Sequence, residues 1–438
     1  MTKFACFMLD GLCLGAALWL NLAMKILLLN DRIPPEGRGG AESVVWRLAR
    51  GLAAAGQDTH VAATTAGAPF DETRAGIPTY HIQAGYPERY RAWLSLWNPQ
   101  TAGPFRQLLR RIKPDVVNAH NIHFLLSYHS LKLAREAGCA VVFSAHDALT
   151  FAYGKLPASF GPGGPERRRA GNYRLPPAYN LRQNRFRYNP FRNTLIKRAL
   201  ERHTQIRTVP SRALAAAFRD NDMPPVEVVH NGIDLDEWAP VAEPVVDRLR
   251  QRLDLPGKRV ILLAGRLTAE KGLRQMLMVL SQLQKTLPDL RLLVLTSRDI
   301  DSQLPAEFAQ LRPSICVGGW LSGEELRAAF QLADVVAAPS IYLDPFPTVV
   351  LEAMAAGTPV VASVFGGARE AVVDGETGFV VNPLDGAAFC DRLLRLLTDD
   401  SLCRRMGLSG RERIAAHFTL DAQVRRMLDI YERALSMC

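Results

Sequence analysis

The chain has 438 residues, of which 48% are hydrophobic and 22% charged, so it is long enough for two domains and too apolar for disorder throughout. Its net charge of +10 favours acidic partners such as phosphorylated small molecules, anionic lipids or nucleic acid. Its seven cysteines are scattered without a Cys-x-x-Cys pair, which argues against a zinc site or a disulfide framework and is typical of a reducing compartment.

Residues 1–23 form an apolar N-terminal extension. From residue 4 onward it is apolar except for Asp10 and Asn21, and it has about the length that spans a bilayer. Asp10 argues against a membrane anchor, because a carboxylate inside such a helix is costly. An anchor, a flexible apolar tail and a start codon assigned too early all stay open.

From residue 24 onward, short β-branched runs alternate with amphipathic stretches, which is the pattern of parallel sheets covered by helices. We expect strands at Lys25–Asn30, His60–Thr64, Val116–His120, Val141–His146, Ile206–Val209, Val260–Ala264, Leu292–Thr296, Ser314–Val317, Val335–Ala338 and Val360–Ser363. The sequence thus predicts an α/β fold with two Rossmann-like domains. Ligands of open α/β sheets bind at the carboxyl ends of the strands, so we expect the active site in a cleft between the domains.

The expected domains have the following bounds. An N-terminal domain spans 24–235, a proline-containing linker spans 236–257, a C-terminal domain spans 258–415, and a C-terminal helix spans 416–438.

A glycine-rich turn, Gly37-Arg38-Gly39-Gly40-Ala41-Glu42, follows the first strand and opens a helix. Glycines there let the backbone approach a ligand closely, and the start of the helix faces that ligand. Many tight turns need glycine without any ligand, so the motif is weak evidence on its own.

Histidines stand at the ends of two predicted strands, at His120 and in the pair His146-Asp147. A purely structural role explains such histidines as well as a catalytic one does. The sequence His120-Asn121-Ile122-His123 resembles part of a metal site, but no third ligand follows at a suitable spacing. We therefore expect no metal, and favour a contact with a ligand or a structural role for His120.

The segment 151–202 is basic and rich in aromatic residues. It contains twelve arginine or lysine residues and two acids, together with glycine and proline runs that prevent long helices. Two explanations stay open: a solvated loop, and a loop that faces a membrane or a lipid diphosphate. A nucleic-acid contact is the third, but we expect none, because the chain contains no recognised module for it.

Two cations follow the first strand of the second half, in Gly265-Arg266-Leu267 and Lys271-Gly272. Arginine and lysine five residues apart can both face a diphosphate and neutralise its charge. A solvated pair of cations is the alternative, but the dipole at the start of a helix disfavours cations. The pair therefore indicates an anion site.

The most informative stretch is 336–361, which reads as a strand, a loop, a short helix and another strand. Thr348 and Val349 fall in the first turn of the helix, where free N–H groups favour an anion. Asp344 and Glu352 flank that turn, and carboxylates accept hydrogen bonds from sugar hydroxyls. A nucleotide-sugar suits this pattern better than a plain nucleotide.

These motifs together resemble glycosyltransferase family 4, also called glycosyl transferases group 1, whose members are retaining enzymes with the two-domain GT-B fold. The family motif usually carries two glutamates separated by seven residues, and here Asp344 takes the place of the first. The resemblance covers nearly all of residues 24–431. It also makes Met24 look like the natural start, since a buried strand follows at once.

The resemblance implies roles for individual residues. Arg266 and Lys271 would stabilise the departing diphosphate, Glu352 would hold the ribose, and Asp344 and His146 would hold the sugar hydroxyls. The implied sets are catalytic His146, Arg266, Lys271 and Asp344; donor-binding Gly39, Gly40, Arg266, Lys271, Thr348, Val349 and Glu352; and acceptor-binding His120, Asp147 and Glu42.

By the same resemblance we expect a retaining, hexosyltransferase-like and metal-independent glycosyltransferase without a cofactor. It would use a nucleotide-diphosphate sugar and a glycan or lipid-linked acceptor, in surface polysaccharide or lipid-linked glycan synthesis. A cytoplasmic location is expected, with or without a peripheral contact with anionic lipid at the inner membrane. A GT-B epimerase and a catalytically inert subunit that binds nucleotide-sugars remain alternatives, the latter encouraged by Asp344.

Overall fold

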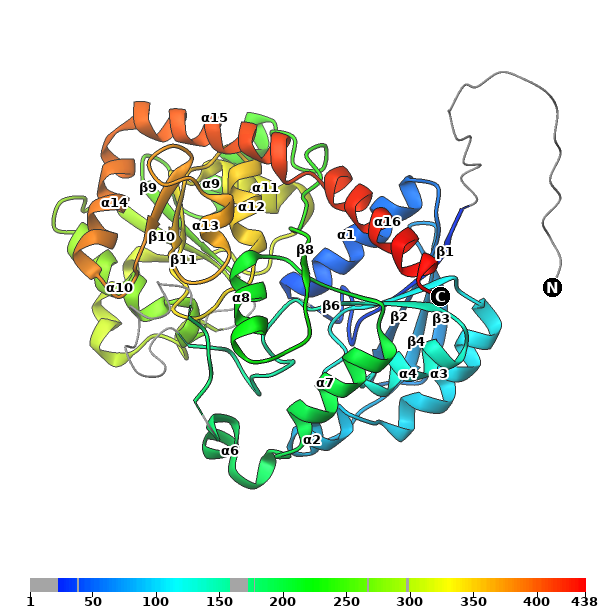
Figure 1. The fold of residues 1–438 in the computed structure, drawn as a ribbon. Coiled ribbons are helices and arrows are strands. Elements are labelled where there is room, and N and C mark those ends of the chain that lie inside the picture. The colour runs from blue at the N-terminus through cyan, green and yellow to red at the C-terminus, as the bar shows by residue number, and fades with distance from the viewer. Residues whose placement is uncertain (1–22, 38, 158–171, 177, 266–267, 297–298) are drawn as a thin grey trace, which may run out of the picture.

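The computed structural model describes residues 23–438 except 38, 158–171, 177, 266–267 and 297–298. These residues form two α/β domains, each built on one sheet (Figure 1). The expected anchor or tail at the N-terminus and the expected Arg266 lie outside the described residues. None of the described helices is long and apolar enough to cross a bilayer.

Within the described residues, the first sheet has eight strands in the order β3-β4-β2-β1-β5-β6-β7-β8. They are β1 (Lys25–Leu29), β2 (Asp58–Thr65), β3 (Phe70–Arg74), β4 (Ile77–Gln83), β5 (Val116–Ala119), β6 (Ala140–Ser144), β7 (Ile206–Val209) and β8 (Glu227–Val228). All neighbours pair in parallel except β3 and β4. The five strands predicted for this half are confirmed.

The sequence did not reveal the β3–β4 hairpin. Its register pairs Arg74 with Ile77, which leaves a two-residue turn of Ala75 and Gly76 with φ of 49° and 78°. Two successive positive φ values are those of a type I′ turn, for which Asn-Gly is the usual signal. Alanine at the first position and the polar, exposed residues of β3 conceal the hairpin in the sequence.

The second sheet, within the described residues, has six strands that all pair in parallel, in the order β11-β10-β9-β12-β13-β14. They are β9 (Arg259–Ala264), β10 (Leu290–Leu295), β11 (Ile315–Val317), β12 (Val335–Ala338), β13 (Val360–Ser363) and β14 (Gly378–Val381). The first five confirm the predicted strands. Strand β14 was not predicted, because its four residues begin with glycine and follow a polar turn.

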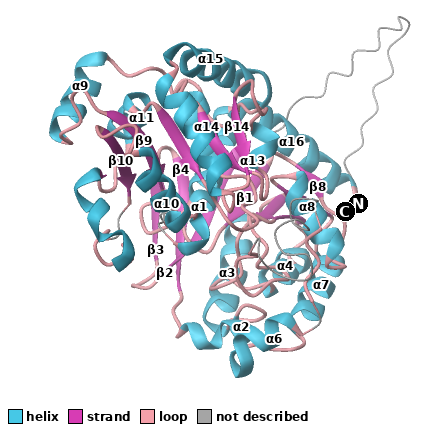
Figure 2. Cartoon of the chain, turned by 90° about the vertical axis from the view of Figure 1, so that its left-hand side faces the viewer, coloured by secondary structure: helices cyan, strands magenta, loops and turns pink. Residues whose placement is uncertain are grey.

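Helices cover both faces of each sheet (Figure 2). The described helices, including those that lie away from the sheets, are α1 (Gly40–Ala54), α2 (Arg91–Leu94), α3 (Pro99–Ile112), α4 (His129–Glu136), α6 (Tyr179–Asn184), α7 (Arg192–His203), α8 (Arg212–Asp220), α9 (Glu243–Arg252), α10 (Leu273–Leu283), α11 (Gly323–Leu332), α12 (Thr348–Ala355), α13 (Ala368–Ala371), α14 (Gly386–Thr398), α15 (Asp400–His417) and α16 (Leu420–Ser436). The described 3-10 turns are η1 (Glu88–Tyr90), η2 (Arg185–Arg187), η3 (Ala269–Lys271) and η4 (Ala306–Ser314). Along β1, Ile26 and Leu28 join one hydrophobic cluster while Leu27 and Leu29 join another. Alternate residues point to opposite faces, so both faces of the sheet are buried.

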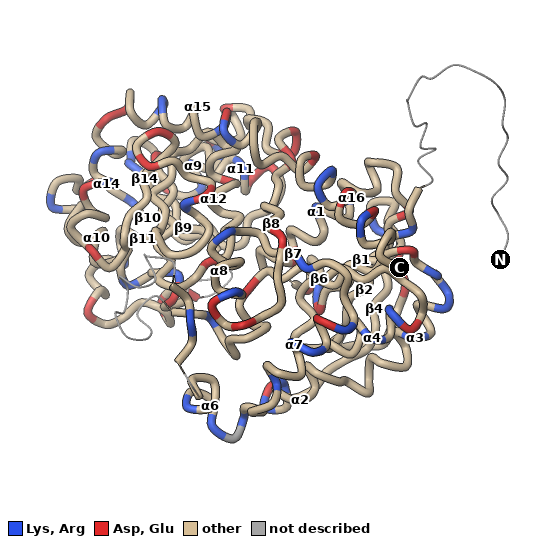
Figure 3. The backbone as a smooth tube through the Cα atoms, viewed as in Figure 1, with Lys and Arg blue, Asp and Glu red and all other residues tan. Residues whose placement is uncertain are grey.

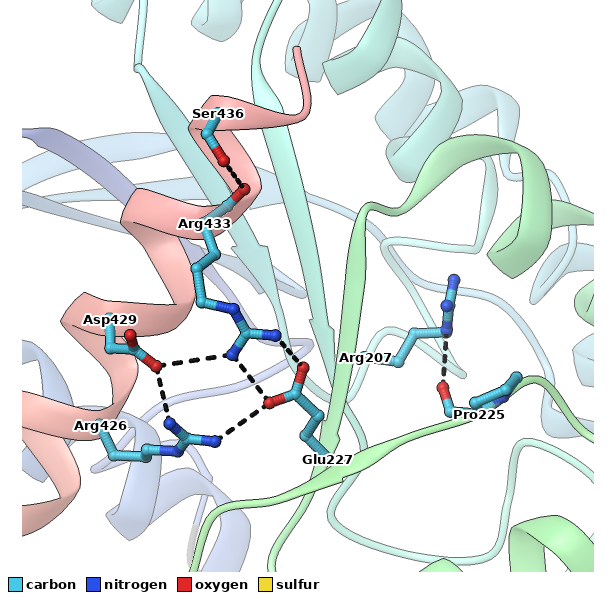
Figure 4. Close-up of polar contacts among 7 residues, drawn as sticks. All are labelled: Arg207, Pro225, Glu227, Arg426, Asp429, Arg433 and Ser436. Atoms are coloured by element: carbon cyan, nitrogen blue, oxygen red, sulfur yellow. Dashed lines mark hydrogen bonds and ion pairs between the residues drawn. The ribbon is translucent and has the colours of Figure 1, made fainter.

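Helix α16 returns to the first domain after the second is complete. Its Met427, Ile430 and Tyr431 pack in the same cluster as β1, and the Tyr431 hydroxyl accepts a hydrogen bond of 2.7 Å from Asn118. At the edge of the sheet, an ion-pair network between α16 and Glu227 of β8 fastens the helix (Figure 4). Its members are Glu227, Arg426, Asp429 and Arg433.

The chain crosses between the domains twice, and the two crossings lie side by side. Ile233 donates its N–H to Phe418 O at 2.9 Å, and its carbonyl accepts from Leu420 N at 2.9 Å. Gly232 lies so close to Thr419 that a Cβ would clash with its carbonyl. The two crossings therefore behave as one short two-stranded connection.

Candidate functional site

The centre of the candidate site is an ion pair between Lys271 and Asp344. Lys271 ends the 3-10 turn η3, and its Nζ lies 2.7 Å from Asp344 Oδ2. The Ser340 hydroxyl donates to the same carboxylate oxygen at 2.9 Å. The Asp344 side chain is only 7% exposed and that of Lys271 is 30% exposed, so the lysine alone reaches solvent.

The surroundings keep Lys271 charged. Burial alone would lower the pKa of Lys271, but the charge of Asp344 and the nearby hydroxyl of Tyr342 raise it above its ordinary value. The pKa of Tyr342 is also raised, first by burial and then by Asp344. The site therefore holds a cation against one carboxylate and one neutral phenol at neutral pH.

Glycines bring the backbone around this pair together. Gly272 has φ of 80°, and a Cβ there would clash with the carbonyl of Pro339, the residue before Ser340. Gly366 has φ of 98° and forms a bridge with Asp344, while Gly367 donates its N–H to Asp344 O at 2.8 Å. A side chain at either position would push the segment that carries Asp344 out of place.

Helix α12 begins at Thr348, four residues after Asp344, as the sequence predicts. Thr348 and Val349 are partly exposed in its first turn. The glycine turn of the first domain lies opposite, because a Cβ on Gly40 would stand 3.6 Å from Thr348 Oγ1. Glycine turn and helix start thus face each other across the domain boundary.

Glu352 has a partner that the sequence did not reveal. Arg47 of helix α1, in the first domain, donates to Glu352 Oε1 at 3.0 Å, and both side chains are 13% exposed. Asp344 and Glu352 therefore do not share one counter-charge, as their motif spacing alone would allow. No pattern in the sequence marks Arg47, which is one of two arginines on an amphipathic helix.

The two strand-end histidines form one pair, in which His120 is buried and His146 is partly exposed. His120 Nδ1 lies 2.9 Å from His146 Nε2, and their rings stack with centroids 5.1 Å apart. Strands β5 and β6 are neighbours in the sheet, so their carboxyl ends bring the two rings together. Burial lowers the pKa of His146 to about 4 and lowers that of His120 as well. Both imidazoles are consequently neutral near pH 7.

A second group of side chains supports this pair. His123 contacts Asp147 Oδ1 at 3.2 Å and the Tyr128 hydroxyl at 2.9 Å. Asp31, after β1, accepts the N–H groups of residues 124–126. His120 and Asp147 thus join His146 at one edge of the sheet, while the carboxylate of Glu42 bends back over Gly39 instead. Among the described residues no group of side chains has the arrangement of a metal site.

Because the pKa values of the histidine pair are lowered, we expect the protein to lose stability in acid. These pKa values are lowered by folding, so between about pH 6.5 and 4 the unfolded chain binds more protons than the folded chain, and stability falls as pH falls. We expect the free energy of unfolding to drop by on the order of 2 kcal/mol more in the natural protein than in His146→Gln between pH 7.5 and 5. Urea unfolding at both pH values measures this, and parallel pH profiles for the two proteins would contradict it.

Part of the basic segment 151–202 lies between the domains beside Asp344. Lys155 Nζ donates to Thr268 Oγ1 at 2.8 Å and lies 3.2 Å from Glu270 Oε2. Leu156 O accepts the N–H of Leu343 at 2.8 Å, next to Asp344. This portion is therefore part of the site rather than a solvated loop, while residues 158–171 lie outside the described residues.

Glu370, on the short helix α13 that follows Gly366-Gly367, also joins the domains. Its carboxylate accepts the N–H groups of Arg212 and Ala213 at the start of α8, both at 3.0 Å, and contacts His230 Nε2 at 3.0 Å. A carboxylate at a helix N-terminus is favourable. Glu370 thus fastens the two domains together.

Two facing Rossmann-like domains, joined by a double crossing, define the GT-B class of fold, and solved structures agree. Sucrose-phosphate synthase from Thermosynechococcus elongatus matches with a TM-score of 0.73 and 23% identity, covering 94% of this chain and 99% of that one. The Anabaena HepE protein in complex with UDP-glucose matches with a TM-score of 0.69 and 19% identity, covering 94% and 100%.

Sequence comparison gives the family. A model described as Glycosyltransferase Family 4 matches residues 38–237, and one described as Glycosyl transferases group 1 matches residues 245–413. Together they match most of the chain, which belongs to glycosyltransferase family 4.

Curated relatives agree with this family. The D-inositol 3-phosphate glycosyltransferase of Corynebacterium efficiens is 33% identical over 224 residues, 49% of this chain and 52% of that protein. The protein of that name from Nocardioides sp. is 29% identical over 425 residues, covering 90% and 85%. The chain spans about half the length of the first of these relatives.

Proposed function

We propose that this protein is a retaining glycosyltransferase that moves a sugar from a nucleotide-diphosphate sugar to an acceptor hydroxyl. The observation that carries this proposal is the charged Lys271, paired with a nearly buried Asp344 and partly open to solvent. Family membership supports it, as does the UDP-glucose bound by the structurally similar HepE protein. Without a ligand, Asp344 is the counter-charge that a diphosphate would replace.

In the proposed reaction, the donor diphosphate takes Lys271 from Asp344. The lysine then stabilises negative charge on the leaving phosphate, together with the expected Arg266 and the first turn of α12. The freed Asp344 carboxylate accepts hydrogen bonds from the sugar hydroxyls. Aspartate is one methylene shorter than the glutamate that is usual in this motif, which suits Asp344 to exchange Lys271 for a sugar hydroxyl within a small space.

The chemical step exchanges one bond at the anomeric carbon for another. The bond from that carbon to the phosphate oxygen breaks, a bond to the acceptor oxygen forms on the same face, and the acceptor proton passes to the leaving phosphate. His146, neutral at pH 7, is suited to hydrogen bonding with the sugar rather than to carrying positive charge. Glu352 would bind the ribose, with Arg47 orienting its carboxylate.

We propose a glycan or lipid-linked acceptor, received on the His120, His146 and Asp147 edge, and no requirement for a metal or cofactor. The basic segment beside that edge supports an anionic or membrane-bound acceptor. A location at the cytoplasmic face of a membrane follows from the same proposal.

Calorimetric titration with UDP-, GDP- and ADP-sugars tests the proposal. We expect one donor to bind, slow donor hydrolysis without an acceptor, retention of anomeric configuration in the product by NMR, and the same rate with and without EDTA. Donor binding without hydrolysis or transfer would instead favour the inert nucleotide-sugar-binding subunit. No binding by folded protein across the panel would overturn the proposal.

A further inference from the structure

One end of the first domain carries a concentration of exposed apolar side chains. Among the described residues twelve large hydrophobic side chains are exposed, and half of them lie in two segments, 88–97 and 179–198. These six are Tyr90, Trp93, Trp97, Leu181, Phe191 and Leu195. Trp93 is 57% exposed and Phe191 is 69% exposed. Apolar groups gathered in this way usually mark a contact surface.

The two segments are packed against each other through Tyr153. Arg91 of α2 donates to Tyr153 O at 2.6 Å, and the Asn180 side chain of α6 accepts the N–H of Tyr153 at 2.9 Å. Tyr188, just before α7, packs with Tyr153 and Ala92 in one small cluster. Figures 1 and 2 both place α2, α6 and α7 at the same lower end of the molecule. Their outward side chains therefore form one surface.

The exposed residues lie on or next to short helices. Tyr90 ends η1, Trp93 lies on α2 and Trp97 follows the end of α2 by three residues. Phe191 immediately precedes α7 and Leu195 lies in its first turn, four residues later, so these two point to the same side. Other residues of both segments are buried in the domain, so the exposed side chains are not part of its core.

Positively charged residues surround these exposed apolar side chains. The two segments contain eight arginine or lysine residues and a single acid, Glu88. Arg89, Arg182, Arg185, Arg187 and Arg198 are exposed there, and basic residues are visible along α2 and α6 in Figure 3. The Arg89 guanidinium lies 4.9 Å from the centre of the Tyr90 ring. Aromatic rings beside cationic side chains are the composition that partitions to the surface of an anionic bilayer.

We propose that the exposed side chains of residues 88–97 and 179–198, the aromatic–basic surface, dock this protein on an anionic lipid bilayer. The rings would enter the headgroup region while the arginines pair with lipid phosphates. A second copy of the chain is a poorer occupant, because two such positive surfaces would repel each other.

Docking there would place the bilayer beside the His120, His146 and Asp147 edge, where the acceptor is proposed to bind. Arg192 of α7 donates to Leu149 O at 2.8 Å, and Leu149 N donates to Asp147 Oδ1 at 2.8 Å. The buried Arg192, which follows Phe191 of the aromatic–basic surface, thus links this segment through Leu149 to Asp147, the residue that follows His146. A membrane-bound acceptor is then within reach of the site, a consequence that rests on the proposed function, whereas bilayer docking itself does not.

Co-sedimentation with vesicles tests the docking. The full chain is mixed with phosphatidylcholine vesicles with and without 30% phosphatidylglycerol, alongside Arg185→Gln/Arg187→Gln and Trp93→Ser/Phe191→Ser. Each near-surface arginine strengthens binding to anionic lipid, so the double arginine variant should partition about 30-fold more weakly to anionic vesicles. The apolar variant should lose at least about tenfold. Matched controls on the second domain, Arg404→Gln/Arg405→Gln and Met278→Ser/Leu408→Ser, should bind as the natural chain does.

A second measurement tests whether the aromatic–basic surface itself meets the bilayer. It distinguishes this surface from residues 1–22, which are the same in all variants. Brominated lipid quenches tryptophans that enter the headgroup region, so Trp93→Phe/Trp97→Phe should bind vesicles normally yet lose part of the quenching. Equal partitioning of all variants, together with unchanged quenching, would overturn the proposal. So would a concentration-dependent dimer that Trp93→Ser/Phe191→Ser abolishes, since the surface would then join two copies. Neither measurement depends on glycosyl transfer.

Discussion

Lys271→Ala is expected to abolish measurable glycosyl transfer. Loss of a charge-assisted contact should weaken donor binding about 10- to 100-fold, and loss of charge stabilisation on the leaving phosphate should lower kcat by about 10²–10³. Calorimetry with the donor and a coupled assay of nucleotide release measure the two effects separately. The matched control is Lys258→Ala, which removes a lysine 28% exposed and paired with Asp289 at 2.5 Å, away from the site.

The same substitution should destabilise the fold, because Asp344 is left nearly buried without its cation. Truncating one partner of such a pair costs about 1–3 kcal/mol of the free energy of unfolding. Adding Asp344→Asn should restore stability but not activity, which separates the structural from the chemical role of Lys271. Full activity in the single variant would show that the leaving phosphate is stabilised elsewhere.

The Gly366→Ala variant is expected to bind the donor more weakly, because the added methyl group would displace the backbone that carries Asp344. The residue has φ of 98°, and its Cβ would clash with both the carbonyl and the N–H of Asp344. A positive φ and a backbone clash together should cost about 2–4 kcal/mol of the free energy of unfolding. The Asp344 carboxylate should also shift relative to Lys271, so donor affinity should fall.

Gly375→Ala is the matched control for that clash. Gly375 has φ of 82°, but a Cβ there meets nothing within 4 Å. We expect a loss of about 1–2 kcal/mol from the positive φ alone, with donor affinity unchanged. Urea unfolding and calorimetry on both variants measure the difference. If the two variants behaved alike, the close contact between Gly366 and Asp344 would have no role in holding the site.

Most of the fold could be predicted because parallel strands buried on both faces appear as continuous aliphatic runs. Ile26–Leu29 and Val360–Ala362 are such runs, and each is a strand in the structure. Strands β3, β4, β8 and β14 were not predicted. Strand β3 is polar and exposed, β4 contains a proline at its second position, β8 has only two residues, and β14 is short and begins with glycine. Their pairing depends on neighbouring strands that are distant in sequence.

The residues of the candidate site could be named from the sequence, but their pairings could not. Lys271 and Asp344 were both expected, yet nothing in a spacing of 73 residues indicates that they form an ion pair. The contact of His120 with His146 follows from the adjacency of β5 and β6, which alternating strands and helices suggest but do not fix. Arg47 joins Glu352 only because the two domains meet, and that geometry is absent from local sequence.

Helix α16 has a consequence for how the protein is made. The first sheet ends at Val228, but the helix that covers one of its faces begins at Leu420. At about 5–20 residues per second, a ribosome would need on the order of 10–40 s to synthesise the intervening chain. During that interval the aliphatic face of β1 lacks its final cover, and Asn118 lacks the hydroxyl of Tyr431. The half of the protein that is translated first is therefore the half that finishes folding last.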